Sequence, residues 1–323
     1  MGKTLKQNKI IGVNVSHSPT ACLLDNGKVT KFLNEDRLIN YKLFTPDTKT
    51  TSLFCLDKIF NEDINCIGYA SYNSIKSSDS PTIVNNIHNK YKHKPFYYDV
   101  KKHHIYHAIC GFYFSNFDEA TCIIVDGGGA EPYNPGYQEL ETIIYINKNY
   151  YSELYKNLSI RKNLSLPRDY LNDKEEYGYP HVLKEKVNGT LVNYSGKAYG
   201  GLSFNYACEK LNFVTKHNHS QAGKLMGLSS YINQEEKYNL NKEDVELADY
   251  IQSQHFKNLC ELVKGCLELS KSKNIILSGG CALNCVNNFK LVKEFPDLNF
   301  FVDPIPGDEG TAIGVAKYIN DYK

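Results

Sequence analysis

The spacing of apolar and polar positions in the first third of the chain predicts a sheet. The runs KIIGVNV, TACLL and KVTKFLNE, which begin at Lys9, Thr20 and Lys28, are typical of strands, and INCIGYA is typical of a fourth. The triplet DNG at residues 25–27 separates two of these runs, and it favours a hairpin because Asn and Gly tolerate positive φ. The chain is therefore expected to open with an antiparallel meander.

The rest of the chain alternates predicted helices and strands. Two apolar strands run into glycine-rich turns, in EATCIIVDGGGA and NIILSGGCALN, and ETIIYINKN is expected to pair with the first of them. LNFFVDPI predicts a last strand. Helices are predicted for HHIYHAICGFYF, FNYACEKLNF, VNNFKLVKEF, GTAIGVAKYIN and a long segment over about 244–270. Residues 150–200 are rich in Lys, Asn, Tyr and Pro without clear periodicity, which predicts an irregular insert.

This order of elements indicates an α/β protein. The two glycine-turn strands lie in different halves of the chain, and helical material precedes each, so we expect two related lobes around a cleft. Residues 1–120 would form the first lobe, including the histidine-rich helix. Residues 121–323 would form the second lobe with the irregular insert.

Composition narrows the class of protein. The 323 residues carry a net charge of +1, so no basic field indicates nonspecific binding to nucleic acid or membrane. The longest apolar runs fall short of the roughly 18 residues that a membrane helix needs, and the N-terminal residues hold no apolar signal core. The ten cysteines are scattered through apolar stretches and are expected to be reduced thiols. We expect a soluble, cytoplasmic protein.

The stretch HHIYHA contains the strongest candidate for metal chemistry. His103 and His107 are four residues apart, so on a helix both project from one face, as two imidazoles must do to share a metal ion. Packing or surface histidines would explain an isolated pair equally well. A metal site also needs a third protein ligand, which spacing alone does not identify.

Glycine turns and charged residues supply candidates for ligand binding. Three consecutive glycines after Asp126 expose backbone N–H groups that suit a phosphate, although a tight turn would use glycines as well. SGGCALN is a second glycine turn at the end of a predicted strand. Lys224 in AGKLMGL is a candidate charge partner for phosphate or carbonyl, but the P-loop pattern is absent. Asp308 in DPIPGDEGTAIG is either a helix cap or a ligand.

Taken in order, these motifs resemble a known family. GVNVSHSPTACLLDNGKV, NEDR, HHIYHA, VDGGG, GKLMGL, SGGCALN and DPIPGDEGTAIG are collinear with the NodU/CmcH carbamoyltransferase family over almost the whole chain. The catalytic half of that family has an actin-like, two-lobed fold of the ribonuclease-H-like class. The two glycine turns also fit the nucleotide-binding elements of this architecture better than the G-x-G-x-x-G pattern of a Rossmann fold.

The resemblance implies an O-carbamoyltransferase. An acceptor hydroxyl would attack the carbamoyl carbon of carbamoyl adenylate, which is derived from ATP and carbamoyl phosphate, and AMP would be released. A divalent metal ion, Fe²⁺ with Zn²⁺ or Mn²⁺ as alternatives, would be held by His103, His107 and Asp308. The adenylate would be bound by Gly127, Gly128, Gly129, Gly279, Gly280 and Asn284.

The base that would accept the hydroxyl proton has two candidates. His17 has a suitable ordinary pKa of about 6.5, although the resembled family usually has His-Asp where this chain has His17-Ser18. Asp126 is the other candidate, and it could equally close the glycine turn. Glu35 and Arg37 of NEDR would either bind the acceptor or form a structural ion pair.

The resemblance also bears on the partners and the acceptor of the protein. Full members of the family carry a following YrdC-like domain that makes carbamoyl adenylate, and this sequence has no room for one, so a separate YrdC-like protein is expected. A homodimer is a further option. The acceptor could be a sugar, an antibiotic or another small molecule, or a hydroxylated nucleoside or DNA base. The composition, without Trp and rich in Tyr, Asn, Lys and Ile, suggests an AT-rich genome, and a stand-alone catalytic half from such a genome is compatible with a virus-encoded enzyme acting in host cytoplasm.

Three other functions compete with carbamoyl transfer. A tRNA threonylcarbamoyl transferase shares the fold and metal site, but its motif normally reads His-x-Glu-Gly-His, whereas His104, Ile105 and Tyr106 fill the interval here. An actin-like ATP-binding kinase or chaperone would use the glycine turns and leave the histidines unexplained. A non-catalytic scaffold would bind adenylate without turnover.

Overall fold

The N-terminal meander forms one side of the first of two sheets, with β3 as its edge strand. A computed structural model of the protein describes residues 8–71, 80–130, 137–160, 184–194, 200–215 and 220–323. The first sheet has the order β3-β2-β1-β4-β5, in which β1, β2 and β3 are antiparallel and β4 and β5 join in parallel. Asn26 and Gly27 adopt positive φ, which confirms the predicted hairpin. The elements are β1 (Lys9–Asn14), β2 (Thr20–Asp25), β3 (Lys28–Asn34), α1 (Glu35–Ile39), α2 (Phe54–Ile59), β4 (Cys66–Ala70), α3 (Ser80–His88) and β5 (Phe96–Tyr98).

The second sheet is built on the two predicted glycine-turn strands. Its order is β12-β11-β6-β7-β8-β10-β9, with β6 and β7 antiparallel as predicted and with β11 parallel to both β6 and β12. The elements of this half are α4 (His103–Ser115), β6 (Glu119–Val125), β7 (Tyr137–Asn147), β8 (Tyr151–Ile160), β9 (Lys184–Val187), β10 (Thr190–Tyr194), α5 (Gly201–Lys210), α6 (Ala222–Ser229), α7 (Lys242–Leu269), β11 (Asn274–Ser278), α8 (Cys285–Glu294), β12 (Asn299–Val302) and α9 (Thr311–Asp321).

The predicted irregular insert needs correction where it is described. Of residues 150–200, the described parts include the strands β8, β9 and β10, and β8 pairs with β7 along most of its length. The periodicity was hidden because Lys156, Asn157 and Ser159 of β8 are buried although they are polar. Residues 161–183 and 195–199, which also belong to that prediction, lie outside the described residues.

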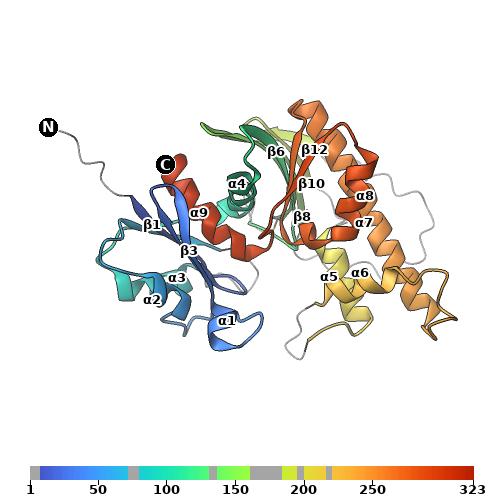
Figure 1. The fold of residues 1–323 in the computed structure, drawn as a ribbon, viewed down its shortest axis with the longest axis horizontal. Helices are drawn as coiled ribbons and strands as arrows, with labels where there is room; N and C mark the ends of the chain where they lie inside the picture. Colours follow the sequence, from blue (N-terminus) through green and yellow to red (C-terminus); the bar gives the residue numbers. More distant parts are fainter. Residues whose placement is uncertain (1–7, 72–79, 131–136, 161–183, 195–199, 216–219) are drawn as a thin grey trace.

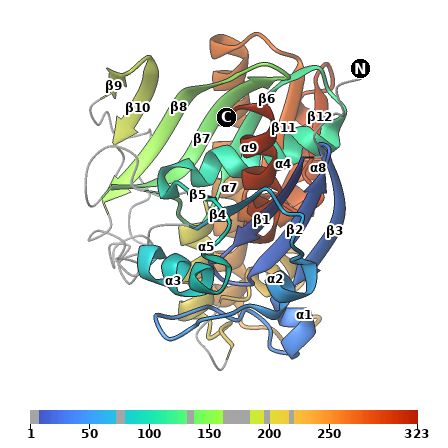
Figure 2. The ribbon, with the colours of Figure 1, turned by 90° about the vertical axis from the view of Figure 1, so that its left-hand side faces the viewer.

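Alternating side chains divide each sheet between two apolar clusters. In β1, Ile11 belongs to the cluster with α2 and α3, whereas Ile10 belongs to the cluster with α9. In β11, Ile275 packs towards α7 and α8, and Ile276 packs towards α4. Figures 1 and 2 show the result: α4 and α9 lie between the sheets, while α2 and α3 cover one outer face and α7 and α8 the other.

Glycines allow α9 to pack very closely against both of its neighbours. A Cβ added to Gly314 of α9 would lie 2.0 Å from the carbonyl oxygen of Tyr106 in α4. A Cβ on Gly12 of β1 would lie 1.9 Å from the carbonyl oxygen of Ala312 in α9. The backbones of β1, α9 and α4 are therefore in direct contact, and no side chain separates them.

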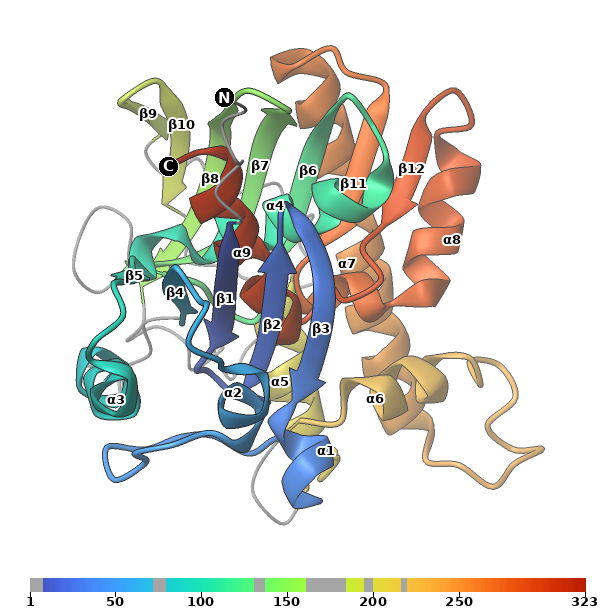
Figure 3. The same cartoon turned by 60° about the vertical axis from the view of Figure 1, so that its left-hand side comes forward.

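The remaining helices largely follow the predicted pattern. The predicted helices at 103–114, 204–213 and 244–270 correspond to α4, α5 and α7 with small shifts of their ends, whereas α6 was not predicted as a helix. α5 and α6 lie below the second sheet in the view of Figure 3. Among the described residues, no helix is both long enough and apolar enough to cross a membrane. The division of the chain at residue 120 stays a prediction.

Candidate active site

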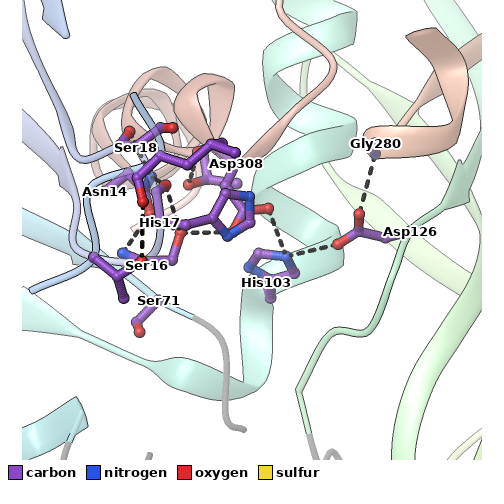
Figure 4. A network of polar contacts seen from close by, with 12 residues as sticks. Asn14, Ser16, His17, Ser18, Ser71, His103, Asp126, Gly280 and Asp308 are labelled. Carbon is purple, nitrogen blue, oxygen red and sulfur yellow. Dashed lines mark hydrogen bonds and ion pairs between the residues drawn. The ribbon is translucent and has the colours of Figure 1, made fainter. Parts of the chain in front are cut away.

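Four buried side chains from three segments converge between the sheets. His103 and His107 lie on successive turns of α4, Asp126 follows the end of β6, and Asp308 lies in the short 3-10 turn before α9. One donor atom from each residue lies within 4.8 Å of every other. We call these residues the donor cluster. Figure 4 shows His103 between Asp126 and Asp308.

The donor cluster is arranged around the two imidazole Nε2 atoms. These atoms are 3.2 Å apart. Asp126 Oδ2 lies 3.2 Å from the Nε2 of His103, and Asp308 Oδ1 lies 3.6 Å and 3.7 Å from the Nε2 atoms of His103 and His107. Two nitrogens and two carboxylate oxygens therefore face a common centre.

Charge inside the donor cluster is strongly coupled. Burial alone would lower the pKa of His103, but Asp308 and Asp126 outweigh it and raise the pKa to about 9. Burial would likewise raise the pKa of each carboxyl group, but the neighbouring histidines hold the pKa of Asp126 and Asp308 well below the usual range. In the protein alone, a proton on His103 balances part of this negative charge.

The donor set suits a divalent cation. Zinc binds imidazole nitrogen and carboxylate oxygen at about 2.0–2.2 Å, so its ligand atoms lie some 3–4 Å from one another. The separations that involve the two imidazole Nε2 atoms, 3.2–4.0 Å, match this spacing. Two histidines with carboxylates are also a ligand set that non-haem Fe²⁺ uses. The structure thus brings His103, His107 and Asp308 together and adds Asp126 as a fourth donor, while their role as metal ligands stays a prediction.

A second layer of contacts orients the two carboxylates. Ser16 Oγ lies 2.5 Å from Asp308 Oδ2 and donates to it, and His17 Nδ1 lies 3.4 Å from the same oxygen. The backbone N–H of Gly280 donates to Asp126 Oδ1 at 3.1 Å. Each carboxylate therefore has one oxygen towards the imidazoles and the other held by the chain, an arrangement that fixes ligand orientation in metal sites (Figure 4).

A cavity of about 390 Å³ borders the donor cluster. His17 reaches it from the first sheet, and Asp126 and Gly280 reach it from the second. Most of the remaining lining is apolar and comes from α5, α6 and the turn before α8. The lining residues are His17, Asp126, Gly127, Gly201, Phe204, Asn205, Ala222, Gly223, Met226, Gly280, Cys281, Leu283 and Asn284. A cavity of this size and character is typical of a small-molecule site.

The predicted glycines fall into two groups. Gly127 and Gly280 line the cavity. Gly128 and Gly129 face protein instead, because a Cβ there would meet the side chain of Gln138 or those of His104 and Glu139 within 2.9 Å. Gly279 has a φ of 83°, and its Cβ would lie 2.5 Å from the carbonyl oxygen of Val125. Their contribution to binding stays a prediction.

Of two other predicted site residues, Asn284 lies at the cavity and Lys224 does not. Asn284 lines the cavity, but its amide group forms a reciprocal pair with Gln252, with both N–O distances 2.9 Å. Lys224 is exposed on α6 and is not part of the cavity lining. Its role in catalysis stays a prediction.

Glu35 of the NEDR motif has a structural role at the start of α2. Glu35 is buried and accepts hydrogen bonds from the backbone N–H groups of Phe54 and Cys55, so it caps the start of α2. Arg37 is exposed, and no ion pair joins it to Glu35 among the described residues. Of the two predicted roles, the ion pair is wrong, and both oxygens of Glu35 are occupied by the backbone.

Sequence reasoning did not identify the α5 and α6 side of the cavity, nor Ser16. Gly201 of α5 packs directly on Gly127, since a Cβ on Gly201 would lie 2.7 Å from the Gly127 Cα. FNYACEKLNF was interpreted only as a helix, and nothing in it signals a ligand. In SHSP, the histidine was noticed, whereas the serine that contacts Asp308 carries no motif of its own.

Comparison with known proteins now adds a family and a fold. A family model described as carbamoyltransferase N-terminus matches residues 42–317. An uncharacterized protein of Methanocaldococcus jannaschii is 25% identical over 321 residues, which are 95% of this chain and 56% of that protein. An uncharacterized protein of Synechocystis is 27% identical over 238 residues, which are 67% of this chain and 35% of that protein. The chain thus spans between about a third and just over half of these relatives.

Two solved structures share the fold at low sequence identity. Full-length HypF in its phosphate- and nucleotide-bound form aligns with a TM-score of 0.55 and 14% identity over 97% of this chain and 55% of that one. A ROK family protein from Streptococcus pneumoniae, solved with sucrose, aligns with a TM-score of 0.50 and 13% identity over 96% of both chains. The fold is the predicted actin-like arrangement of two lobes, each with its own sheet.

Proposed function

The chain belongs to the carbamoyltransferase N-terminus family, and from this membership we propose that it transfers a carbamoyl group from carbamoyl adenylate to an acceptor hydroxyl. The single observation that carries the proposal is the donor cluster beside the cavity. A kinase of the same fold needs a nucleotide cavity, but it gives no reason for two buried imidazoles facing two carboxylates.

The metal ion belongs to the proposal. His103, His107, Asp126 and Asp308 would hold a divalent ion, with Fe²⁺ the first candidate and Zn²⁺ or Mn²⁺ the alternatives. When bound, such an ion would supply a positive charge that polarises a carbamoyl or phosphoryl oxygen. Burial of all four side chains supports this assignment, because charged groups are removed from water only where partners balance them.

The lining of the cavity suits an adenylate. Gly127 and Gly280 let a phosphate approach the backbone where the ends of β6 and β11 meet the start of α5. The apolar wall of Phe204, Met226 and Leu283 provides a surface for a base. HypF, whose fold this chain shares, was solved with phosphate and nucleotide bound, which supports a nucleotide as the occupant here.

His17 is the group we propose as proton acceptor. In the transfer, the acceptor oxygen forms a bond to the carbamoyl carbon, the bond from that carbon to the phosphate oxygen breaks, and AMP leaves. The hydroxyl proton passes to His17, which lines the cavity and has Asp308 beside its Nδ1. Asp126 is the weaker candidate, because both of its oxygens already face His103 and the Gly280 N–H.

Alternatives of other classes predict different behaviour. A kinase or chaperone would produce ADP without need of the donor cluster, and an inactive scaffold would bind nucleotide without releasing AMP. A threonylcarbamoyl transferase would act on tRNA, and the interval between His103 and His107 argues against it. The carbamoyl donor is proposed to come from a YrdC-like activity, and the acceptor is a sugar, another small molecule or a hydroxylated nucleoside.

The test follows AMP release from carbamoyl adenylate, generated in the assay from ATP and carbamoyl phosphate by a YrdC-like protein. The protein is loaded with Fe²⁺, Zn²⁺ or Mn²⁺ and offered a panel of sugar and nucleoside acceptors. We expect acceptor-dependent release that falls at least about 100-fold in the His103→Ala, His107→Ala double variant. His93→Ala, at a half-exposed histidine paired with Glu62, is the matched control. Equal release by the double variant and the wild type would contradict the proposal.

A further inference from the structure

The polar side chains that line the cavity differ in how much of their hydrogen-bonding capacity is already used. Asp126 faces His103 and Gly280 with its two oxygens. His17 faces Asp308. Asn284 exchanges two hydrogen bonds with Gln252, and its Oδ1 also accepts from the backbone N–H of Asn287 at 3.1 Å. The amide that sequence analysis selected for ligand binding is therefore committed to the protein.

Asn205 is the second amide in the cavity wall, and its situation is the opposite. It lies on α5 four residues after Gly201, so the two residues share a helix face. Its Nδ2 lies 3.9 Å from the position of a Cβ on Gly127, where Gly127 has open space on the cavity side. Within the described part of the chain, its side chain forms no hydrogen bond. Asn205 is thus an available donor and acceptor in a mostly apolar wall.

The position of Asn205 along the cavity indicates which part of a bound nucleotide it would contact. Gly201 holds the start of α5 against Gly127. These two residues line one end of the cavity, where a phosphate would lie. Ala222 and Met226 of α6 continue the wall as an apolar surface suited to a base. A ribose joins phosphate and base, so it would pass the Asn205 amide.

We infer that Asn205 is a specificity-determining residue that recognises the ribose hydroxyls of the bound adenylate. The inference rests on the proposed function in taking a nucleotide as the occupant. A side-chain amide suits this task because a hydroxyl both donates and accepts, and the amide offers both partners from one planar group. A site built to bond a hydroxyl discriminates against an analogue that lacks it, since the amide is then left unpaired.

The test measures binding of AMP, 2′-deoxy-AMP and 3′-deoxy-AMP by calorimetry. We expect the wild type to bind AMP about three- to tenfold more tightly than at least one deoxy analogue, as the loss of one hydrogen bond would require. Asn205→Ala should weaken AMP binding by a similar factor and bind that analogue as well as AMP. Lys210→Ala, at an exposed residue of the same helix, should keep the wild-type preference.

A second variant separates recognition from a change in shape. Asn205→Asp keeps the size and the acceptor but loses the donor and adds negative charge near the phosphate turn, so it should bind AMP more weakly than Asn205→Ala does. Equal AMP affinity in Asn205→Ala and wild type, or a preserved preference over both deoxy analogues, would overturn the inference while leaving the proposed function intact. A wild-type protein that binds no AMP would overturn both.

Discussion

Two buried polar clusters border the same cavity and satisfy their polar atoms in opposite ways. The donor cluster brings two imidazoles and two carboxylates together around a common centre. The second cluster, which we call the amide network, consists of Gln252 and His255 on α7 and Asn284 and Asn287 at the start of α8.

In the amide network, donors and acceptors pair with one another except at His255 Nε2. Gln252 and Asn284 exchange two hydrogen bonds, and Asn287 Nδ2 donates to the Gln252 carbonyl oxygen and faces His255 Nδ1, each at 2.9 Å. No charge is left to balance. Burial and polarity alone therefore do not distinguish a ligand site from a structural one; the distinction is whether the polar atoms satisfy one another or converge on a shared point.

The largest difference between the two clusters should appear in metal affinity, when Asp126→Asn changes the donor cluster. The variant keeps the size of the side chain and an acceptor for the Gly280 N–H, but it removes a negative charge 3.2 Å from His103 Nε2. We expect the affinity for a divalent metal to fall by more than about 100-fold, beyond the usual loss for an outer-shell partner. Metal titration after dialysis measures it. Asp118→Asn, at an exposed aspartate paired with Lys148, should bind metal like the wild type.

A substitution in the amide network should lower the stability of the fold and leave metal affinity nearly unchanged. Asn284→Leu leaves the Gln252 amide and the Asn287 N–H without their partner, so we expect a loss of about 1–3 kcal/mol in the free energy of unfolding, with metal affinity nearly unchanged. Denaturant titration measures this loss. In the Gln252→Leu, Asn284→Leu double variant, both members of the pair are removed, and the loss should be smaller than the sum of the single losses. Additive losses would contradict the pairing.

A further expected effect, of similar size, is a pH dependence of stability that originates in the amide network. Burial lowers the pKa of His255 to about 4, and its Nε2 has no hydrogen-bond partner among the described residues. The unfolded chain would bind a proton near pH 6.5 and the folded protein near pH 4, so stability is lost as the pH falls through this window. Between pH 7 and pH 5 the loss amounts to about 2 kcal/mol.

Unfolding at the two pH values measures this contribution. His255→Gln removes the titrating ring and should lose less stability on acidification than the wild type. His93→Gln, at a half-exposed histidine, should retain the wild-type difference. A His255→Gln variant with the same pH dependence as the wild type would show that other groups cause it.

The extent of sequence prediction differed between elements for physical reasons. The hairpin at Asn26 and Gly27, the α4 histidine pair and the two glycine-turn strands were predicted because their signals are local. β8 was missed because its buried polar residues pair with distant ones: Lys156 contacts Glu139, and Asn157 Nδ2 donates to Glu141 at 2.5 Å. A polar residue that a remote partner satisfies is indistinguishable in sequence from an exposed one.

The candidate site shows the same limit. The resemblance supplied Asp308 as a third ligand, but the proximity of Asp126 to the histidines depends on how β6 ends beside α4. Asn284 was selected because it follows a glycine turn, whereas Asn205 lies in a helix without a motif. Lys224 was selected for its neighbouring glycines and is exposed on α6. Motifs locate backbone turns well, and they do not say which side chains the tertiary packing leaves available.

The contact between β1, α9 and α4 has a consequence for the ion selectivity of the proposed metal site. Gly314 brings the α9 backbone against α4, which carries His103 and His107, and Asp308 lies just before α9 begins. The two backbone segments that carry these donors are thus held at a fixed separation, because no side chain lies between α9 and α4 at Gly314. A frame of this stiffness adjusts poorly to ionic radius, so it should favour ions with bonds of about 2.0–2.2 Å over Ca²⁺, which needs about 2.3–2.6 Å and more ligands.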